Sequence, residues 1–411
     1  METIRTRVAG LDVHRDRVVA CVRLVDGGGR VTTQKRSFST MTFGNGELAN
    51  WLTDRAVTTA VMESTGVYWK PIYYGLESTI DELWLVNATH VKRVPGRKTD
   101  VSDAEWLADV AAHGMVRPSF VPPPPIRELR ELTRYRKTQV DARTREIQRL
   151  EKVLQDVGIK LSSVASGTWS KSCRSMVEAL IAGERDTTVL ADLSQSRMRA
   201  KKDQLELALD GHFAQHHGAV ARCVIDHIDF LDGSIESLNR GVVDRLRAFE
   251  PAIGLLCEIP GWGRTTAEIF LAETGGDMSV FPTPEQLASW AGVAPGTHES
   301  AGKRHAAASM NGNRWLGRAL IEAARAAART KGTFLSARYR RLVARRGPNK
   351  AAVAIAHTMV VIAWHILTTG EPYRELGDDY YTRREDPQRQ AHRLTRQLET
   401  LGFNVAITPA A

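Results

Sequence analysis

Four consecutive prolines, Pro122 to Pro125, divide this sequence into two parts of different character. Proline has no backbone N–H donor and its ring blocks the preceding turn, so a helix or a central strand does not continue through such a run. Short apolar segments separated by turns lie before the prolines, and long charged segments with helical periodicity lie after them. We therefore predict a first domain over residues 1–125.

The segment before the prolines has the pattern of a mixed sheet. Residues 7–21 predict two strands joined by a tight turn, and three glycines at 27–29 lead into a third strand near 31–38. The following segments favour strands at 58–62 and 81–87 and helices at 46–54, 68–76 and 100–113. Three strands in a meander followed by alternating strands and helices are typical of a ribonuclease H-like (RuvC-like) fold. The predicted fold class is therefore α/β plus α.

The segment after the prolines is predicted to be helical. Residues 126–157 and 205–249 have long helical patterns, which favour an antiparallel coiled-coil arm within a domain of residues 126–250. An insertion near residues 160–200 has weak periodicity and receives no assignment. A compact all-α domain is expected over residues 251–375, followed by an extended tail over 376–411.

The positive charge of the sequence is concentrated in one segment. The formal net charge is +9, yet residues 303–350 contain thirteen basic side chains against Glu322 alone, so the rest of the chain is slightly acidic. A concentrated surplus of this kind is typical of a nucleic-acid-binding surface. The candidate phosphate-binding residues are Lys303, Arg304, Arg314, Arg318, Arg340, Arg341, Arg345 and Arg346.

Cysteine usage and hydropathy indicate a chain of the reducing cytoplasm. The four cysteines have no CxxC spacing, which argues against a structural zinc site or a disulfide framework, and the first residues lack the apolar core of a secretory signal. Residues 351–370 are uncharged, but they include His357, His365 and three threonines, which favours a buried helix over a membrane span. We expect no membrane partner.

Four carboxylates follow the predicted strands and helices in the order of a metal-dependent nuclease. Asp12 lies inside the first strand, where a carboxylate is costly unless it is paired or binds a cation. Glu63 ends a short apolar strand, and Asp100 and Asp103 begin a helix three residues apart. Carboxylate oxygens at this density suit Mg²⁺. The alternative is structural: Asp100 would cap the helix and Asp103 would interact with its dipole.

Two motifs of the predicted C-terminal domain are candidates for phosphate chemistry. The turn PGWG, with Gly261 and Gly263, resembles a helix-hairpin-helix, whose second helix can bind phosphate through backbone N–H groups, although it can also be a plain connection between helices. Ser300 lies in a glycine-rich loop followed by Lys303 and Arg304. His298 is a candidate proton acceptor for this hydroxyl, and the alternative for Ser300 is an ordinary loop serine.

The segments GLDVH, VMESTGVYW and KTDVSDAEWLA, followed by PGWG and WAGVAPGTHESAGK, together resemble DEDD-type transposases of the IS110 family, also called bridge-RNA-guided recombinases. The resemblance implies a RuvC-like domain that binds Mg²⁺ through Asp12, Glu63, Asp100 and Asp103. It also implies a transposase domain whose Ser300 becomes covalently linked to a DNA strand. The implied partners are double-stranded DNA at the element ends and the target, and a noncoding bridge RNA that chooses both sites. The two long helices of the arm favour a homodimer, and the resemblance implies a tetramer, in the cytoplasm and associated with the bacterial nucleoid.

Three functional hypotheses follow from these residues. The first is a recombinase that moves its own DNA element by metal-assisted serine attack with RNA-directed site choice. The second is a metal-dependent nuclease or resolvase in which Ser300 is structural and no covalent intermediate forms. The third is a nucleic-acid-binding scaffold without catalysis, in which the acidic residues are caps and partners of salt bridges.

Overall fold

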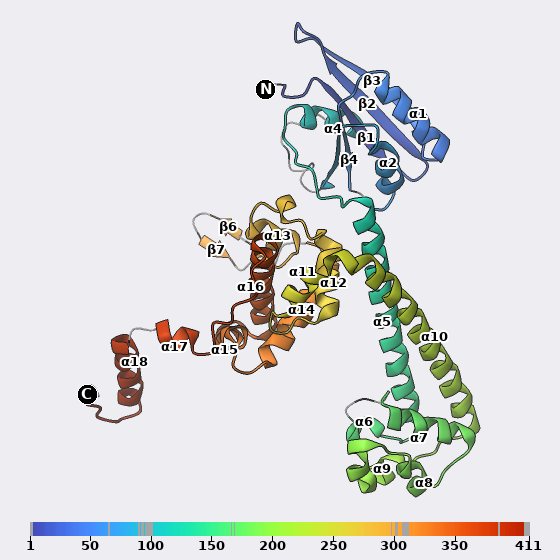
Figure 1. The fold of residues 1–411 in the computed structure, drawn as a ribbon, viewed down its shortest axis with the longest axis vertical. Helices are drawn as coiled ribbons and strands as arrows, with labels where there is room; N and C mark the ends of the chain where they lie inside the picture. The colour runs from blue at the N-terminus through green and yellow to red at the C-terminus, as the bar shows by residue number, and fades with distance from the viewer. Residues whose placement is uncertain are drawn as a thin grey trace. The chain divides into compact units, whose positions relative to one another are not determined.

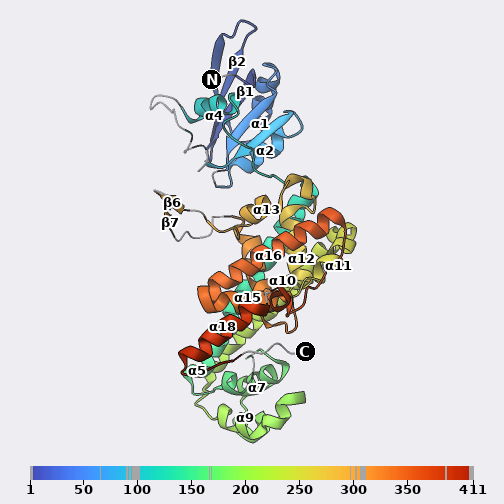
Figure 2. The ribbon, with the colours of Figure 1, turned by 90° about the vertical axis from the view of Figure 1, so that its left-hand side faces the viewer.

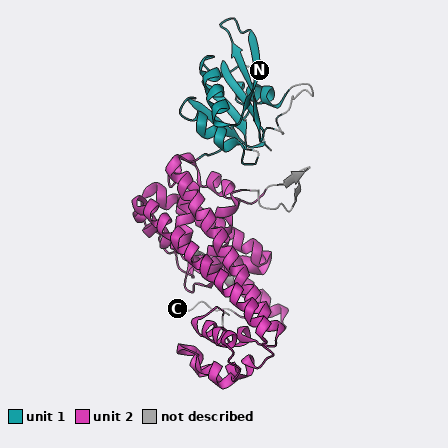
Figure 3. Ribbon diagram, turned by 90° about the vertical axis from the view of Figure 1, so that its right-hand side faces the viewer, with its two compact units in different colours: residues 1–121 teal, residues 122–411 magenta. Residues whose placement is uncertain are grey.

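The computed structural model describes residues 3–64, 66–88, 91, 94, 102–165, 167, 169–296, 298–300, 303–305, 312–384 and 387–406. The chain divides into two compact units, Met1–Val121 (unit 1) and Pro122–Ala411 (unit 2), shown in Figure 3. The division falls at the first residue of the proline run.

Unit 1 is built on a five-stranded mixed sheet (Figure 1). Its strands are β1 (Arg7–Val13), β2 (Arg17–Val25), β3 (Val31–Ser39), β4 (Thr59–Glu63) and β5 (Glu82–Val86), in the spatial order β3-β2-β1-β4-β5. The first three strands pair antiparallel, whereas β4 pairs parallel with both β1 and β5. The predicted mixed sheet is therefore confirmed, and its strand order is that of a ribonuclease H-like fold.

Helices cover both faces of this sheet. On one face, α1 (Thr42–Thr53) and α2 (Trp69–Leu76) enclose a core that contains Leu11, Leu52 and Met62. On the other face, α4 (Asp103–Ala112) packs on Val8, Val61 and Val86. Because strand side chains alternate between faces, this distribution determines which side chains of β1 and β4 lie beneath α4.

Two long helices, α5 (Pro124–Asp156) and α10 (Gln215–Leu246), pack along each other in unit 2 (Figures 1 and 2). Glu128 pairs with Arg245 near the start of α5, and Glu146 pairs with His227 further along it, so the two helices are antiparallel. Pro124 and Pro125 form the first turn of α5, where a missing N–H leaves no helical hydrogen bond unmade. That the pair functions as a coiled-coil arm stays a prediction.

The prediction of one continuous helix over 205–249 is wrong. The structure has α9 (Lys202–Leu209), then an irregular segment, then α10 from Gln215. The chain bends there to pair with the end of α5: the His212 N–H donates to the Val157 carbonyl at 2.8 Å, and the Lys160 N–H donates to the Ala208 carbonyl at 2.7 Å. A Cβ at Gly211 would lie 2.6 Å from the Val157 oxygen, so the close approach requires glycine.

The insertion near 160–200, which the sequence left unassigned, folds into short helices. These are α6 (Leu161–Val164), α7 (Lys171–Ala182), α8 (Thr187–Asp192) and the 3-10 helix η1 (Ser196–Lys201). Cys173, Met176 and Leu205 form an apolar core here together with Leu150 of α5 and Ile225 of α10. Helices of four to twelve residues carry too few turns for a clear periodic signal, and tertiary packing stabilises them.

The remainder of unit 2 is mostly helical, but the prediction of an all-α domain over 251–375 is wrong in one place, where the short strands β6 (His298–Ser300) and β7 (Lys303–His305) pair. It contains η2 (Arg247–Phe249), α11 (Glu250–Cys257), α12 (Arg264–Thr274), η3 (Met278–Val280), α13 (Pro284–Trp290), α14 (Arg314–Arg329), α15 (Phe334–Arg346), α16 (Pro348–Thr369), α17 (Tyr380–Arg384) and α18 (Pro387–Thr400). The last two helices lie in the predicted tail. The arm, the helical domain and the tail belong to one compact unit, and the boundaries proposed between them stay predictions.

Among the described residues, α16 is the one helix long and apolar enough to cross a membrane. It packs against α11, α13, α14 and α15, and Ile355, Met359 and Val360 are fully buried. The indole N–H of Trp364 donates to the Phe281 carbonyl at 2.7 Å. These contacts are those of a core helix, in agreement with the prediction for residues 351–370.

Candidate functional site

Asp12 and Glu63 lie at the same edge and on the same face of the sheet in unit 1. Leu11 of β1 pairs with Met62 of the parallel strand β4, so the next residues, Asp12 and Glu63, are neighbours at the carboxyl ends of both strands. Val8 and Val61 pack beneath α4, and side chains two and four residues apart share a face. Asp12 and Glu63 therefore project toward the α4 side.

The start of α4 approaches this edge because the helix lies directly on β1. A Cβ at Gly10 would lie 1.9 Å from the Ala104 carbonyl oxygen, which shows that the backbones of helix and strand are in contact. The other end of α4 is fixed near the start of β1, since the Ile4 N–H donates to the Ala112 carbonyl at 2.9 Å. The helix thus runs antiparallel to β1, and Asp103 at its first position lies toward the end of β1 that carries Asp12.

The polar contacts at this edge are those of a partly exposed acidic site. The Asp12 side chain is 28% exposed, and its Oδ2 lies 3.1 Å from Nε2 of His14. Among the described residues no three His, Cys, Asp or Glu side chains are grouped closely enough to hold a metal. Asp100 lies outside the described residues. The donor chemistry of Asp12, Glu63 and Asp103 fits a hard cation such as Mg²⁺, which takes oxygen ligands and retains several waters.

Cys21 lies beneath α4 beside the same strand. It pairs with Gly10 across β1 and β2 and is fully buried. Burial, reinforced by the charge of Glu105, raises the pKa of its thiol to about 11. The thiol therefore stays protonated at neutral pH and acts as a core side chain and not as a nucleophile or metal ligand.

We expect Gly10→Ala to destabilise unit 1 by about 1–3 kcal/mol, because the new methyl group would force α4 away from β1. The displacement would also move Asp103, so metal-dependent activity should fall more than stability alone explains. Gly46→Ala in α1 is the matched control: nothing lies within 4 Å of the added Cβ, and alanine favours a helix. Urea unfolding of both variants measures the difference, and equal stability would contradict the close approach of the two backbones.

Ser300 lies in a two-stranded hairpin and not in the open loop that the sequence predicted. Strand β6 (His298–Ser300) pairs antiparallel with β7 (Lys303–His305), and Ser300 is the register partner of Lys303. The structure describes the backbone of these strands. It places Ser300 at the end of β6 and Arg304 opposite Glu299.

The PGWG turn connects α11 to α12 against α14. Gly261 has φ +87°, and a Cβ there would lie 2.5 Å from the Ala323 carbonyl oxygen, so this glycine has a packing role. Trp262 is buried, and its ring centroid lies 5.3 Å from that of Phe270. Gly263 is exposed and precedes the first turn of α12. Phosphate binding at Gly261 and Gly263 stays a prediction.

Six of the eight predicted basic residues occupy helices of unit 2, whereas Lys303 and Arg304 lie in β7. Arg314 and Arg318 lie on α14, where the Arg314 guanidinium is 5.1 Å from the centroid of the Trp315 ring. Arg340, Arg341, Arg345 and Arg346 lie on α15. The backbone positions of these six residues are therefore set by two helices.

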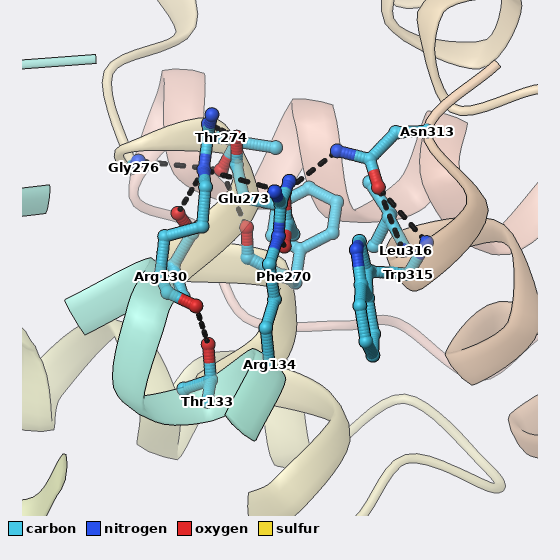
Figure 4. A network of polar contacts seen from close by, with 11 residues as sticks. Arg130, Thr133, Arg134, Phe270, Glu273, Thr274, Gly276, Asn313, Trp315 and Leu316 are labelled. Carbon is cyan, nitrogen blue, oxygen red and sulfur yellow. Dashed lines mark hydrogen bonds and ion pairs between the residues drawn. The ribbon is translucent and has the colours of Figure 1, made fainter. Parts of the chain in front are cut away.

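A buried ion-pair network in unit 2 was missed by the sequence interpretation (Figure 4). The Glu273 carboxylate of α12, 1% exposed, accepts from both Arg134 Nε and Nη2 at 2.7 Å and from Asn313 Nδ2 at 2.6 Å. The Arg130 Nε lies 3.3 Å from the same carboxylate. The signal was present in the sequence, since Glu273 interrupts the apolar stripe of the segment TTAEIFLAET.

Comparison with known protein families assigns the chain. Residues 9–159 match the DEDD-type IS110 family described as "Transposase", and residues 254–340 match the "Transposase IS116/IS110/IS902 family". The first match contains most of β1, all of β4 and α4, and their carboxylates, and the second contains the PGWG turn, Ser300 and the first half of α15. The chain belongs to the IS110 family of transposases. Members of this family are DNA-cleaving and strand-transferring enzymes, so the general prediction of a DNA transposase is confirmed.

Individual relatives of this IS110-family transposase cover much of its length. It is 25% identical over 377 residues to the transposase for insertion sequence element IS1111A of Coxiella burnetii, which is 90% of this chain and 91% of the relative. It is 26% identical over 285 residues to a probable family 20 transposase of Pseudomonas aeruginosa, covering 68% and 75% of the two chains. A putative transposase of Sinorhizobium fredii is 32% identical over 184 residues, covering 44% of this chain and 45% of the relative.

Proposed function

We propose that this IS110-family transposase cuts and exchanges DNA strands with Mg²⁺ held by Asp12, Glu63, Asp100 and Asp103, and with Ser300 as the nucleophile. The observation that carries the proposal is the meeting of Asp12 and Glu63 at one edge and face of the sheet, beneath the start of α4. A structural role for Asp12 and Glu63 would not require them to share one edge.

The metal and the acidic residues have different roles in this proposal. When bound, the ions stabilise the charge that develops on the oxygens of a phosphodiester during strand cleavage. Asp12 and Glu63 provide oxygen ligands from rigid strand ends, and Asp103 provides one from the first turn of α4. Rigid elements hold such ligands more accurately than loops do.

The proposed covalent step takes place at Ser300. Its hydroxyl oxygen forms a bond to the phosphorus of a DNA strand, while the bond from phosphorus to the leaving deoxyribose oxygen breaks. The hydroxyl proton passes to a base, for which His298 is the candidate, and the leaving oxygen takes up a proton from water. Lys303, the register partner of Ser300, and Arg304 would neutralise the phosphate.

The proposal includes the partners implied by the resemblance to IS110 transposases. Double-stranded DNA provides the element ends and the target, and a noncoding bridge RNA pairs with both and chooses the sites. A homo-oligomer, a dimer or a tetramer for the synaptic complex, would build each site from unit 1 of one subunit and unit 2 of another. We place the reaction in the bacterial cytoplasm at the nucleoid.

Trapping the protein on DNA tests the proposed mechanism. Native protein incubated with Mg²⁺, element DNA and copurifying RNA should form a denaturation-resistant adduct that maps to a phosphoserine at Ser300. Ser300→Ala should bind the same DNA but form no adduct and no recombinant product, because alanine has no hydroxyl to form the ester. Recombination by Ser300→Ala at the native rate would refute the serine mechanism.

A metal-dependent resolvase without a covalent intermediate is the second candidate. This candidate is favoured because Asp12, Glu63 and Asp103 all belong to unit 1, whose strand order is that of ribonuclease H-like nucleases. Strand cleavage without any adduct, unchanged in Ser300→Ala, would establish it.

We expect the basic residues of α15 to determine the salt dependence of DNA binding. The variant with Arg340, Arg341, Arg345 and Arg346 all changed to Gln should bind DNA more weakly. The slope of log K against log salt should flatten by about 0.9 for each phosphate that the variant no longer neutralises. Titrations from low to high salt measure the slope. Changing Arg222, Arg240 and Arg247 to Gln, with Lys171→Gln, removes four cations elsewhere in unit 2 and should flatten it less.

A further inference from the structure

A cavity of about 230 Å³ opens between α5, α12 and α14 within unit 2. Val140 of α5, Ile269 of α12 and Ala319 of α14 provide apolar atoms to its wall, and the Trp315 ring lines it as well. Thr265 and Thr266 line it from the first turn of α12. The cavity thus combines an apolar wall with hydroxyl groups at a helix N-terminus.

The charge of the cavity lining is positive. Four cationic residues line it, Arg134, Arg136, Lys137 and Arg318, against the two acids Glu273 and Glu322. Glu273 is already neutralised by Arg134 and Arg130. Arg318 is 61% exposed, and its ion pair with Asp141 is long, at 3.9 Å. Lys137 pairs with Asp141 at 3.0 Å and with Glu322 at 3.6 Å, so an anionic group of a ligand would meet Arg318 first and compete with these acids for Lys137.

Arg136 provides a further donor at the wall. Its side chain is 8% exposed, and Nη1 donates to Glu268 at 2.7 Å and to Asn239 at 3.1 Å. The buried Nη2 has no hydrogen-bond partner among the described residues. A buried guanidinium nitrogen without an acceptor is costly, which favours a role in binding over a role in stability alone.

The network around Glu273 fixes the start of α14, which carries Trp315, at the cavity (Figure 4). Asn313 donates to Glu273 through Nδ2, and its Oδ1 accepts from the backbone N–H groups of Trp315 and Leu316 at 3.0 and 3.1 Å. The carboxylate on α12 is thereby connected to the first turn of α14. The backbone of Trp315 is therefore held before any ligand arrives, which lowers the entropic cost of binding.

We infer that this cavity binds one unpaired nucleotide of a nucleic-acid strand, with the base at the apolar wall and Trp315, and the phosphate at Lys137 and Arg318. A free phosphate would leave the apolar wall unused, and an uncharged apolar ligand would leave the cations unused. An unpaired base has both an aromatic face and an adjacent phosphate. The inference rests on the proposed function, because strand exchange and RNA pairing both expose unpaired nucleotides.

Photocrosslinking tests the inference in the full chain. Single-stranded DNA and RNA of one mixed sequence, substituted with 5-iodouracil, would be irradiated with the protein and the attached peptide sequenced. The expected attachment site is the α14 peptide that contains Trp315. RNA and DNA both contain a base and a phosphate, so a crosslink to either one supports nucleotide binding at the cavity. The strand that crosslinks shows whether the bound nucleotide belongs to RNA or to DNA. Crosslinks confined to other peptides would overturn it.

Two variants separate the cavity from general nucleic-acid binding. Trp315→Ala should weaken single-strand binding roughly 5- to 100-fold, while binding of duplex DNA changes by less than about twofold. Val140→Trp, which fills the cavity without altering Trp315, should reduce the crosslink as well. Tyr135→Ala removes an exposed aromatic of α5 that does not line the cavity, and it should leave the crosslink unchanged.

The outcomes also distinguish the cavity from the serine mechanism. Ser300→Ala should retain the crosslink at Trp315, since the cavity does not use the hydroxyl. If Ser300→Ala retained the crosslink and also recombined normally, the serine mechanism of the proposed function would be refuted, but nucleotide binding at the cavity would still be supported. Nucleotide binding at the cavity would be refuted if Trp315→Ala and Val140→Trp both bound single strands as the native protein does. Thermal melting would show that both variants are folded.

Discussion

Asp12→Asn should reduce DNA strand cleavage by roughly 100-fold or more in the presence of Mg²⁺. The amide has almost the same shape as the carboxylate, so the fold of unit 1 should persist, but its neutral oxygen is a much weaker ligand for a divalent cation. Asp12 is expected to have the largest effect of the single acids because it lies on the central strand of the sheet, between β2 and β4. Cleavage of labelled element DNA at several Mg²⁺ concentrations measures the loss.

Asp16→Asn is the matched control for this prediction. It removes the same charge four residues further along the chain, from a side chain that is 84% exposed and pairs with Arg15. Its cleavage rate should equal that of the native protein. If Asp12→Asn bound Mg²⁺ and cleaved DNA as the native protein does, the metal site would be refuted and the scaffold hypothesis would gain support.

Glu273→Ala should destabilise unit 2 by about 3–5 kcal/mol, which is a large part of the stability of an ordinary domain. The substitution leaves the Arg134 and Arg130 guanidiniums, 32% and 14% exposed, without their carboxylate partner. It also removes the acceptor that connects Asn313 to α12. Urea unfolding followed by the far-ultraviolet circular dichroism of the helices measures the decrease in the free energy of unfolding.

Two further variants show whether the charge of Glu273 is responsible. Glu273→Gln keeps one oxygen acceptor and should lose less stability than the alanine variant. Glu258→Ala removes an exposed carboxylate just before the PGWG turn and should change stability by less than about 0.5 kcal/mol. Equal stability of Glu273→Ala and Glu258→Ala would show that the network of Figure 4 contributes nothing.

The elements of unit 1 were predictable because each has a strong local signal. The strand β1 carries apolar side chains on both faces until Asp12 interrupts the pattern, and β4 ends its apolar run at Glu63. Helix α4 was expected over 100–113 and is observed over Asp103–Ala112. Strands and helices of this kind are fixed by periodicity and by turns, which are properties of neighbouring residues.

The parts that were not predictable depend on contacts between distant residues. The break before α10 results from pairing with residues 157–160, and the short helices α6 to α8 are stabilised by a core that they share with α5 and α10. Ser300 was expected in a loop, because a three-residue strand has no periodicity to read. Helix or strand propensity decides little when tertiary contacts outweigh it.

The sequence by itself determined the order of the strands along the chain, the division at Pro122, the four candidate acids and the concentration of positive charge after Ser300. Only the tertiary structure decided that Asp12 and Glu63 share an edge, that α4 lies on Gly10, and that Glu273 joins α5, α12 and α14. The physical reason is distance along the chain. Charge, turns and periodicity are local, whereas a shared edge, a backbone contact and a buried ion pair exist only after segments up to about 140 residues apart have packed together.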